Sequence, residues 1–450
     1  MGRGTNAEAP MPVPQLVLSM RCDQPTAAPS RHRLDGLDEV RFGRGPALVE
    51  RDVRARRLTI RLPDPRMSSD HGRLVREGDT WVLDDPASKN GCVWNGTLTR
   101  RELLGDGDVL ELGHTFFLMR VASPAPGAPD LDALALAPAA PELVTFAGGL
   151  AESYARLARV GPTDVPVLIV GETGTGKELV ARAVHTLSGR RGPFVAVNCG
   201  ALPETLVEAE LFGARKGAFS GATGDRPGLV RGADGGTLFL DEIAELRASS
   251  QAAFLRVLQE HEVLPLGETR AIKVDVRFCA ATHRHLDDMV KAGGFRDDLY
   301  ARLYGYTIEL PPLRARREDL GLLVRALLLR RPGGERATFT PAAVRLLFAH
   351  DWPHNVRELE KTLAAAVALA DGRAIDVGDL GDLARRVATA RPVATTAPLT
   401  GDDALRARLR ALLETHQGNI AAVARAIGKD RMQIHRWARR LAIDLDAYRR

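Results

Sequence analysis

A glycine-rich segment that ends in a lysine is the first part of this sequence whose residues suggest chemistry. It reads GETGTGK over residues 171–177 and stands between an apolar run at 165–170 and a helical pattern rich in Leu, Val and Ala. Its glycines allow backbone N–H groups to converge on phosphate oxygens, the N-terminus of the following helix adds its dipole, and Lys177 neutralises phosphate charge. The order strand, loop, helix therefore predicts a P-loop for a nucleotide. Its candidate binding residues are Gly171, Glu172, Thr173, Gly174, Thr175, Gly176 and Lys177. The next residue, Glu178, departs from the general motif, which has Ser or Thr there to hold magnesium.

Two adjacent carboxylates end a second apolar run, GGTLFLDE at residues 235–242. At the carboxyl edge of a parallel sheet such a pair faces the nucleotide, where Asp241 can orient a hydrated Mg²⁺ and Glu242 can polarise the attacking water. Acids at the end of a strand also serve as helix N-caps, but the P-loop upstream favours the catalytic interpretation. A third apolar run, residues 274–281, ends at Thr282, which either senses the γ-phosphate or is an ordinary turn residue.

Two arginines follow in the segment FRDDLYARL at residues 295–303. Phosphoryl transfer is accelerated by a cation beside the transition-state charge, and a neighbouring subunit often donates it. Arg296 and Arg302 do not share one helical face, so they can have different roles. Arginines beside aspartates are usually surface ion pairs, and this is the alternative for both.

The elements that position these residues follow from two Pro- and Ala-rich stretches, 122–141 and 387–400, which we interpret as linkers. Before the first, short apolar runs separated by Gly, Asp and Asn turns predict an all-β sandwich. Between the two, β-branched runs alternate with helical periods, which predicts an α/β fold with a parallel sheet. The last part has an all-α pattern. The predicted domains are 15–121, 142–386 and 401–450.

Composition is typical of a soluble multidomain protein. A chain of 450 residues exceeds one compact core, and 45% hydrophobic with 26% charged residues is usual for globular chains. Neither a transmembrane run nor a signal-peptide pattern occurs, so we expect a cytoplasmic protein without membrane contact. The four cysteines are far apart in the sequence, which argues against a CxxC metal site or redox pair.

The formal net charge of +5 is concentrated in residues 401–450, which hold eleven Arg and Lys against six acids. Three helices are predicted there, and the Gly-containing turn before the last one is typical of a helix-turn-helix, whose final helix enters the major groove of double-stranded DNA. A solvated basic face of a helical bundle is the alternative. The DNA-binding candidates on the last helix are Arg431, Gln433, His435, Arg436, Arg439 and Arg440.

The middle part resembles the AAA+ domain of bacterial enhancer-binding proteins, the activators of sigma-54 RNA polymerase. It contains LFGARKGAFSGA at residues 211–222, similar to the family's GAFTGA loop that engages the sigma factor, although such a stretch can also be a simple hinge. The resemblance implies an α/β ATPase subdomain at 142–313 and a helical lid at 314–386. It also implies that the sigma factor is contacted by Gly217, Ala218, Phe219, Ser220, Gly221 and Ala222.

The same resemblance assigns roles to single residues. Asn198 matches the switch that holds the catalytic Glu until the γ-phosphate is sensed, and Thr282 falls at sensor I, with His283 where the family usually has Asn. Arg357, in WPHNVREL, matches the sensor II residue that reaches the nucleotide, and Glu178 matches the family's own P-loop variant. The implied catalytic set, with Asp241 as metal ligand and the last two as trans-acting arginine fingers, is Lys177, Asp241, Glu242, Asn198, Thr282, Arg296 and Arg302.

The N-terminal part resembles a forkhead-associated (FHA) domain over nearly its whole length, on the motifs FGRG, SSDH, SKNG and GDGDVLELG. The resemblance implies loops that bind phosphothreonine, with Arg44 and Ser68 on the phosphate, Asn90 on the ligand backbone and His71 supporting the loop. An Arg with hydroxyl and amide donors provides what a phosphate dianion requires. Loops that serve only dimerisation are the alternative. The C-terminal part resembles a Fis-type helix-turn-helix module.

Together these features predict an ATP-driven activator of sigma-54-dependent transcription, with Mg²⁺ as cofactor and sigma-54 RNA polymerase holoenzyme as partner. The tail is expected to bind upstream DNA as a dimer and the AAA+ ring to assemble as a hexamer. The front domain is expected to bind a phosphothreonine protein or a phosphorylated segment of the chain itself. Two alternatives stay open: a phosphopeptide-binding scaffold with an ATPase that only switches assembly, and an AAA+ remodeller of a client other than sigma.

Overall fold

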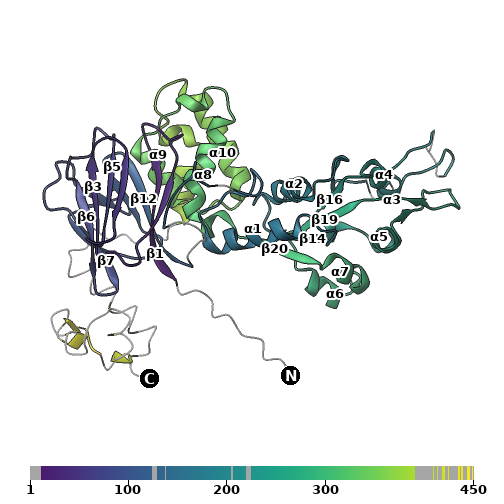
Figure 1. The fold of residues 1–450 in the computed structure, drawn as a ribbon, viewed down its shortest axis with the longest axis horizontal. Helices are drawn as coiled ribbons and strands as arrows, with labels where there is room; N and C mark the ends of the chain where they lie inside the picture. The colour runs from purple at the N-terminus through teal and green to yellow at the C-terminus, as the bar shows by residue number, and fades with distance from the viewer. Residues whose placement is uncertain are drawn as a thin grey trace.

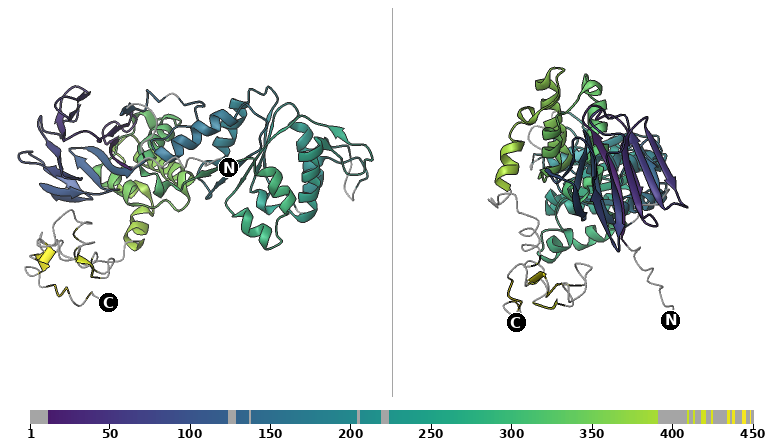
Figure 2. Two further views of the ribbon diagram at one scale, coloured as in Figure 1. Left: turned by 60° about the horizontal axis from the view of Figure 1, so that its bottom comes forward. Right: turned by 90° about the vertical axis from the view of Figure 1, so that its left-hand side faces the viewer.

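The part of the chain that the computed structural model describes comprises residues 12–123, 129–136, 138–203, 206–218 and 224–390, together with isolated residues between 409 and 448. Figure 1 shows a β-rich part at one end, an α/β part at the other and a helical part between them, and the views in Figure 2 agree with this order. Among the described helices, none has the length and apolar character needed to cross a membrane.

The N-terminal part is a sandwich of two β-sheets, which confirms the predicted class. Its strands are β1 (Val13–Arg21), β2 (Ser30–Arg33), β3 (Glu39–Arg44), β4 (Leu48–Asp52), β5 (Arg57–Leu62), β6 (Gly72–Glu77), β7 (Thr80–Asp84), β8 (Cys92–Trp94), β9 (Thr97–Thr99), β10 (Arg101–Leu104), β11 (Val109–Leu112), β12 (Thr115–Ala122) and β13 (Asp130–Asp132). One sheet has the order β13-β2-β1-β12-β11-β8-β9 and the other β10-β7-β6-β3-β5-β4. Strand β13 lies in the segment that we interpreted as a linker, where it pairs with β2.

The pleat of β12 gives the seven-stranded sheet two buried faces. Successive side chains of a strand point to opposite faces of its sheet. Phe117 therefore points into the sandwich, where its ring centroid lies 5.0 Å from that of Phe42. Phe116 points outward, yet it is fully buried because helices cover the outer face.

The central part is built on a parallel sheet of β14 (Val167–Gly171), β15 (Phe194–Asn198), β16 (Thr237–Asp241), β19 (Arg277–Thr282) and β20 (Tyr306–Leu310), in the order β15-β16-β19-β14-β20. Four of these strands, β14, β15, β16 and β19, coincide with the apolar runs predicted from the sequence, whereas β20 was not predicted. The other elements are α1 (Gly148–Val160), α2 (Lys177–Ser188), α3 (Val207–Phe212), α4 (Leu229–Gly232), η1 (Ile243–Glu245), α5 (Ala248–Glu260), β17 (Glu262–Val263), β18 (Ile272–Lys273), α6 (Leu286–Lys291) and α7 (Asp297–Leu303). Because parallel strands end at the same edge, β14, β16 and β19 bring the P-loop, the paired carboxylates and Thr282 together.

A helical lid follows the sheet, as predicted. It consists of η2 (Leu313–Ala315), η3 (Arg317–Asp319), α8 (Leu320–Leu329), η4 (Gly334–Arg336), α9 (Pro341–Ala349), α10 (Asn355–Ala370), η5 (Val377–Leu380) and α11 (Leu383–Ala390). The hydroxyl of Thr340 caps α9 by accepting a hydrogen bond from the backbone N–H of Ala343. Trp352, just before α10, is 2% exposed and donates from Nε1 to the carbonyl oxygen of Leu347. This tryptophan is therefore an anchor of the lid core.

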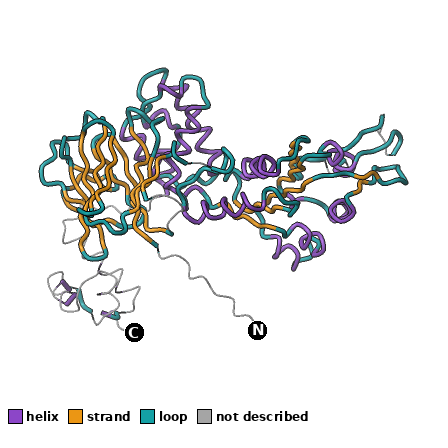
Figure 3. The backbone as a smooth tube through the Cα atoms, viewed as in Figure 1, coloured by secondary structure: helices purple, strands orange, loops and turns teal. Residues whose placement is uncertain are grey.

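The lid packs on the outer face of the seven-stranded sheet. Figure 3 shows the lid helices directly beside the strands of the sandwich. Helix α8 approaches β1 so closely that a Cβ atom added to Gly321 would lie 2.0 Å from the carbonyl oxygen of Ser19. The backbone N–H of Phe339 donates to the carbonyl oxygen of Cys22 at 2.8 Å. Backbone contact of this kind requires a glycine on the helix and a fixed docking geometry.

Side chains complete this contact between sandwich and lid. The ring of Phe116 stacks on that of Phe348 from α9, with centroids 6.0 Å apart and planes 9° apart. At its rim, Arg345 of α9 donates two hydrogen bonds, of 2.7 and 2.9 Å, to the carboxylate of the buried Glu111. The interface thus combines an apolar centre with a bidentate ion pair, the strong geometry for such a pair.

Candidate nucleotide site

The P-loop joins β14 to α2, and two of its glycines are required by geometry. Gly174 has φ +81°, and a Cβ atom there would come within 2.3 Å of the carbonyl oxygen of His354 in the lid. The backbone N–H of Val356 donates to the carbonyl oxygen of Gly174 at 2.9 Å. Gly176, the N-cap of α2, has φ +106°, which residues with a Cβ rarely adopt. The N-terminus of α2 therefore points its positive dipole end at the loop.

A lysine and two carboxylates form a charged cluster at this edge of the sheet. Lys177 is 6% exposed, its Nζ donates a 3.0 Å hydrogen bond to the carbonyl oxygen of Gly171, and it lies 3.6 Å from Oε1 of Glu242. Asp241 ends β16 beside them. Burial and the nearby charge of Glu242 raise the pKa of Asp241 above its ordinary value, and Lys177 opposes this shift. The arrangement places a cation and two acids where a triphosphate is expected.

Glu242 has an unusual backbone conformation and a hydrogen-bond partner, His283, that was not predicted as a site residue. Its φ of +53° lies in the left-handed region, and such strain in a non-glycine residue gathers at functional sites. Nδ1 of His283 lies 2.6 Å from Oε2 of Glu242. In the sequence, His283 was visible only as a replacement of the family's usual Asn. The contact joins residues that follow two neighbouring strands, so it depends on the pairing of β16 with β19.

Asn198 and Thr282 lie at the same edge but are engaged with nearby backbone. Asn198 ends β15 and is the register partner of Asp241. Its Oδ1 accepts a hydrogen bond of 3.0 Å from the backbone N–H of Gly200. Thr282 is buried, and its hydroxyl oxygen accepts a hydrogen bond of 2.9 Å from the backbone N–H of Arg284. The structure therefore gathers the residues predicted for the switch and for sensor I around the acidic pair.

Glu172 of the P-loop is held by the lid. Arg314 donates to its two carboxylate oxygens at 2.9 and 2.5 Å, and Nδ2 of the buried Asn355 donates at 3.1 Å. These hydrogen bonds, that from Arg314 first, lower the pKa of Glu172 to about 2. Neither Arg314 nor Asn355 was predicted as a site residue. They are more than 140 positions away from Glu172 in the chain, and one Arg or Asn among many gives no sequence signal.

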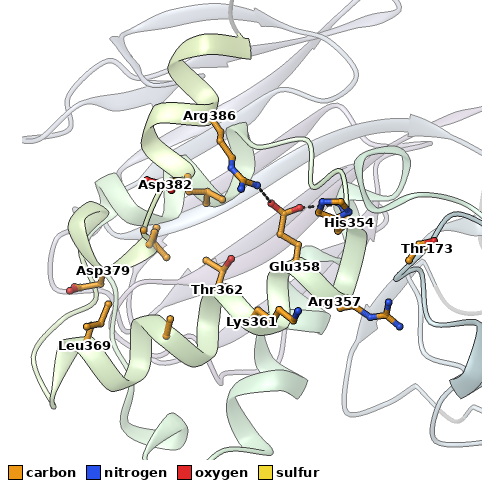
Figure 4. A pocket seen from close by; sticks show the side chains of 14 residues that line it. Thr173, His354, Arg357, Glu358, Lys361, Thr362, Leu369, Asp379, Asp382 and Arg386 are labelled. Carbon is orange, nitrogen blue, oxygen red and sulfur yellow. Dashed lines mark hydrogen bonds and ion pairs between the residues drawn. The ribbon is translucent and has the colours of Figure 1, made fainter. Parts of the chain in front are cut away.

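A cavity of about 560 Å³ opens beside the P-loop, between α10, η5 and α11 (Figure 4). Arg357, the predicted sensor II residue, lies on its wall and extends toward the side where Thr173 lies (Figure 4). Glu358 stabilises this wall by accepting hydrogen bonds of 3.0 Å from Arg386 and 3.1 Å from the backbone N–H of His354. Arg357 is therefore carried to the junction of lid and P-loop.

Three predicted residues are engaged outside this cluster. Arg296 makes a bidentate pair with Asp298 at the start of α7, with distances of 2.9 and 2.7 Å. Arg302, in the last turn of α7, lines a separate cavity of about 350 Å³. Glu178 pairs with Arg182 along α2 at 2.7 Å. The two arginines are thus presented apart from the P-loop of their own subunit.

The predicted sigma-contacting loop is described at its base. Ala214 and Arg226 exchange backbone hydrogen bonds of 3.0 and 2.8 Å, and the N–H of Arg215 donates to the carbonyl oxygen of Leu266, between β17 and β18. The predicted sigma-contacting loop and the loop between β17 and β18 therefore share a base, and both extend from the α/β part (Figure 1). Gly217 and Ala218 are described, and the loop residues outside the described part are Phe219, Ser220, Gly221 and Ala222.

Loops at one end of the sandwich bring the predicted phosphothreonine-binding residues together. The backbone N–H of Arg44 donates to the carbonyl oxygen of Ser68 at 2.8 Å, and the N–H of Ser68 donates to Nδ1 of His71 at 2.9 Å. His71 is buried, and burial lowers its pKa below the ordinary value. Asn90 donates from Nδ2 to a backbone carbonyl in the loop that carries Ser68. His71 is thus a support, whereas Arg44 and Asn90 are exposed.

The C-terminal part is described at isolated positions. The buried hydrophobic side chains among them form one apolar cluster, Leu409, Leu413, Ile420, Ala424, Ile434, Ala438 and Ile443. His435 is exposed beside the buried Ile434. The other DNA-binding candidates lie outside the described residues: Arg431, Gln433, Arg436, Arg439 and Arg440.

Family models match all three of the larger parts of the chain. Residues 40–113 match the FHA domain, residues 143–309 the sigma-54 interaction domain, and residues 314–396 the AAA+ ATPase lid domain. The fold and the site therefore define an AAA+ domain of the sigma-54-interacting class, preceded by an FHA domain.

Similar proteins give the same class. The transcriptional regulatory protein ZraR of Klebsiella oxytoca is 48% identical over 280 residues, which are 60% of this chain and 62% of that relative. The sigma54-dependent transcriptional regulator SfnR of Pseudomonas fluorescens (strain Pf0-1) is 50% identical over 230 residues, 50% of this chain and 63% of the relative. The crystal structure of NtrX from Brucella abortus in complex with ADP is 32% identical, covers 67% of this chain and 70% of its own, and has a TM-score of 0.51.

This chain therefore contains an FHA domain, a sigma-54 interaction domain and an AAA+ lid domain, and it is similar over half of its length to a regulator named as sigma-54-dependent. The matched segments span less than two thirds of the length of the two curated relatives. The family models for the sigma-54 interaction domain and the lid domain cover the AAA+ part, which contains the candidate nucleotide site.

Proposed function

We propose that the chain hydrolyses ATP at the cluster of Lys177, Asp241 and Glu242 and uses the energy to remodel the closed complex of sigma-54 RNA polymerase. The observation that supports this most is the cluster itself. The buried Lys177 lies 3.6 Å from the carboxylate of Glu242, whose backbone is in the left-handed region, and the P-loop leads into helix α2 beside them. Lys177 and the loop amides hold the β- and γ-phosphates, and Glu242 polarises the attacking water.

The residues present fit a hydrated Mg²⁺. Among the described residues, no group of three or more His, Cys, Asp or Glu side chains converges on one point. Mg²⁺ keeps several waters and is usually bound by one or two carboxylates together with phosphate oxygens, so the single carboxylate of Asp241 is a sufficient protein ligand. When bound there, the ion neutralises charge on the transferred phosphoryl group.

Glu242→Gln tests the proposed chemistry. The amide has the same shape but cannot act as the carboxylate does, so we expect ATP binding to persist and phosphate release to fall by about two orders of magnitude or more. Equilibrium nucleotide binding and steady-state phosphate release should be measured on the full chain. Undiminished turnover rejects the assigned chemistry. Nucleotide binding without turnover in the unaltered chain supports the scaffold alternative.

Sigma contact is proposed for the loop that begins at Gly217. Pull-down of sigma-54 in the presence of a transition-state analogue of ATP hydrolysis should capture the unaltered chain and lose Phe219→Ala, while both proteins hydrolyse ATP. Capture that does not depend on Phe219 would favour a client other than sigma.

The tail is proposed to bind upstream double-stranded DNA as a dimer. Measuring DNA binding by the full chain and by Arg436→Ala at several salt concentrations would test this.

A hexameric ring is proposed because Arg296 and Arg302 are presented away from their own P-loop. Mixing two inactive proteins, Lys177→Ala and Arg302→Ala, tests action in trans. A mixed ring contains some sites with an intact P-loop from one subunit and an intact finger from its neighbour, so activity should reappear. No recovery on mixing, despite co-assembly, would argue that the arginines act within their own subunit.

Phosphothreonine binding at Arg44, Ser68 and Asn90 is proposed to regulate the ATPase through the lid. The loop that carries Ser68 is braced by Asp64, whose Oδ2 accepts hydrogen bonds from the N–H of His114 at 2.7 Å and the hydroxyl of Thr115 at 2.9 Å. His114 in turn accepts from the N–H of Cys22 at 2.9 Å.

The same strand ends touch the lid. The carbonyl of Cys22 accepts from Phe339, and Phe116, next to Thr115, stacks on Phe348. A change in the Ser68 loop can therefore reach the lid, and with it Arg357, through packed and hydrogen-bonded neighbours. Coupling of this kind has to be measured, because spatial continuity alone does not establish it.

Gly321→Ala should break this route without touching the phosphothreonine loops. Its Cβ would overlap the backbone of Ser19, so the sandwich should undock, whereas Gly378→Ala in the lid meets open space and serves as the control. A phosphothreonine peptide should bind both variants but change the ATPase rate only in the control. An equal response in both variants would exclude the lid as the route, and no peptide binding at all would reject the proposed ligand.

A further inference from the structure

His283 occupies a position from which it can orient the catalytic carboxylate. It directly follows β19, the strand that neighbours β16, and its Nδ1 lies 2.6 Å from Oε2 of Glu242. A carboxylate can only accept a hydrogen bond, so the imidazole carries a proton on Nδ1 and donates it to this oxygen. A bond of this length between an N–H donor and a carboxylate is strong and directional.

The other neighbours of Glu242 leave this task to His283. Lys177 lies 3.6 Å from Oε1, beyond ordinary hydrogen-bond length, and its proposed role is to bind the phosphates. Asn198, the predicted switch residue, accepts hydrogen bonds through Oδ1 from the N–H groups of Gly200 and Ala201, at 3.0 and 3.1 Å.

The backbone of Glu242 adds a reason for an external support. With φ +53°, this residue begins a turn immediately after a buried strand, so the strand does not determine where its side chain points. Its side chain is 17% exposed and that of His283 is 41% exposed. A strong hydrogen bond from a neighbouring strand end can hold such a carboxylate at one angle.

We propose that His283 is a positioning residue for ATP hydrolysis: its Nδ1–H fixes Oε2 of Glu242 so that Oε1 faces the side of Lys177 and the expected γ-phosphate. This inference rests on the proposed ATPase function. His283 does not itself touch the reacting atoms and acts only through the orientation of Glu242.

Substitutions that place a hydrogen-bond donor at different distances from the backbone, together with one that removes it, separate this role from packing. The amide nitrogen of Asn is attached to Cγ, as Nδ1 of His is, so His283→Asn can donate the same hydrogen bond. In His283→Gln the amide is one bond further from the backbone, in the position of Nε2, and cannot replace Nδ1. His283→Ala removes the donor altogether.

The experiment is steady-state ATP hydrolysis by the full chain, with nucleotide affinity measured separately. Misplacement of a catalytic group by about 1 Å can cost about 100-fold in rate, so we expect His283→Ala and His283→Gln to lower kcat by about 10- to 100-fold. The KM and the nucleotide affinity should be nearly unchanged, and His283→Asn should recover most of the lost kcat. In a Glu242→Gln background, His283→Ala should add little further loss, because residues that act as a unit are not additive.

Each other outcome overturns the inference. Equal rescue by Asn and Gln, or a rise in KM with unchanged kcat, would mean that His283 fills space or binds nucleotide. Full activity of His283→Ala, with Glu242→Gln inactive, would reject the role of His283 and leave the proposed function intact. Absence of hydrolysis by the unaltered chain would reject the proposed function and this inference with it.

Discussion

The lid contacts two parts of the molecule, the FHA sandwich and the P-loop, through faces of different chemical character. Toward the FHA sandwich it presents apolar side chains and backbone: Phe348 stacks on Phe116, and Phe339 bonds to Cys22. Toward the P-loop it presents polar side chains that converge on Glu172, namely Arg314 and Asn355 (Figure 4 shows the neighbouring wall of α10). The centre of the first face is buried and apolar, whereas the ion pair of the second face is partly exposed.

This difference indicates which contact can change during a nucleotide cycle. Apolar burial is lost as a whole when surfaces separate, so the contact between lid and sandwich, centred on Phe116 and Phe348, forms or separates as a unit. We call this contact the dock. Exposed ion pairs contribute little and can exchange partners, so the pair of Arg314 and Glu172 can adjust. The N–H of Val356 and the buried Asn355 also bond to the P-loop, so this face adjusts at its exposed part. We infer that the lid and the FHA sandwich move together as one body relative to the α/β part.

The largest expected effect comes from removing an aromatic ring from the buried centre of the face toward the sandwich. Phe116→Ala should cost about 3–5 kcal/mol, because it leaves a cavity under Phe348 that neither part can easily close. Hydrogen exchange of α9 should increase strongly. Phe117→Ala is the matched control: it is equally buried but faces Phe42 inside the sandwich, so it should destabilise the sandwich and leave protection of α9 nearly intact. Unchanged exchange in α9 of Phe116→Ala would contradict the dock.

This pair also shows what the sequence could and could not predict. The strands of both β-containing parts, the P-loop and the acidic pair were predictable, because each depends on local patterns of apolar and turn residues. The uninterrupted run TFFLM at 115–119 lacks the alternation of a half-solvated strand, which is a signal for two buried faces. The identity of the covering element carried no such signal, since α9 is far away in the chain.

Contacts within the site were less predictable than the residues themselves. Spacing identified Glu242 as a candidate, but its bond to His283 depends on the register of two strands, and that of Glu172 to Arg314 on the docking of the lid. Charged residues are common on surfaces, so opposite signs alone do not identify such pairs.

The second expected effect concerns the ion pair at the rim of the dock. Arg345→Ala leaves the carboxylate of Glu111, which is 6% exposed, without its bidentate donor, and should cost about 2–3 kcal/mol. The double variant Arg345→Ala with Glu111→Gln should recover part of this loss, because no buried charge then lacks a partner. Thermal unfolding of the unaltered chain, of Arg345→Ala, of Glu111→Gln and of the double variant gives the coupling energy. Additive losses would mean that the pair is not coupled in solution.

Acidity should modulate the same dock. Burial, and then the charge of Asp319, raise the pKa of Glu318 to about 7, and Asp106 adds to this, whereas Arg120 of β12 opposes it at 3.0 Å. The docked state therefore binds a proton that the undocked state releases above its ordinary pKa of 4.5. The contribution of Glu318 to the stability of this contact is greatest below about pH 4.5 and declines, on the order of 2 kcal/mol, as pH rises to about 7.

Glu318→Gln should remove this pH dependence. The amide stays neutral, so hydrogen exchange of α8 at pH 8 should be slower than in the unaltered chain, and the difference should vanish near pH 4.5. Glu335→Gln, at an exposed ion pair of the lid, is the control and should change neither value. A decline between pH 4.5 and 7 that persists in Glu318→Gln would assign it to other groups.

The smallest effect is expected on the face toward the P-loop. Arg314 and Glu172 have side chains that are 43% and 42% exposed, so Arg314→Ala should change stability by no more than about 1 kcal/mol. Asn355→Ala should cost more, because Asn355 is buried and its Oδ1 also accepts a hydrogen bond from the N–H of Leu313 at 2.8 Å. Nucleotide affinity should respond to both. If Arg314→Ala destabilised the chain as much as Phe116→Ala does, the two faces would be equally rigid, and the lid could not turn on the P-loop while it stays fixed to the sandwich.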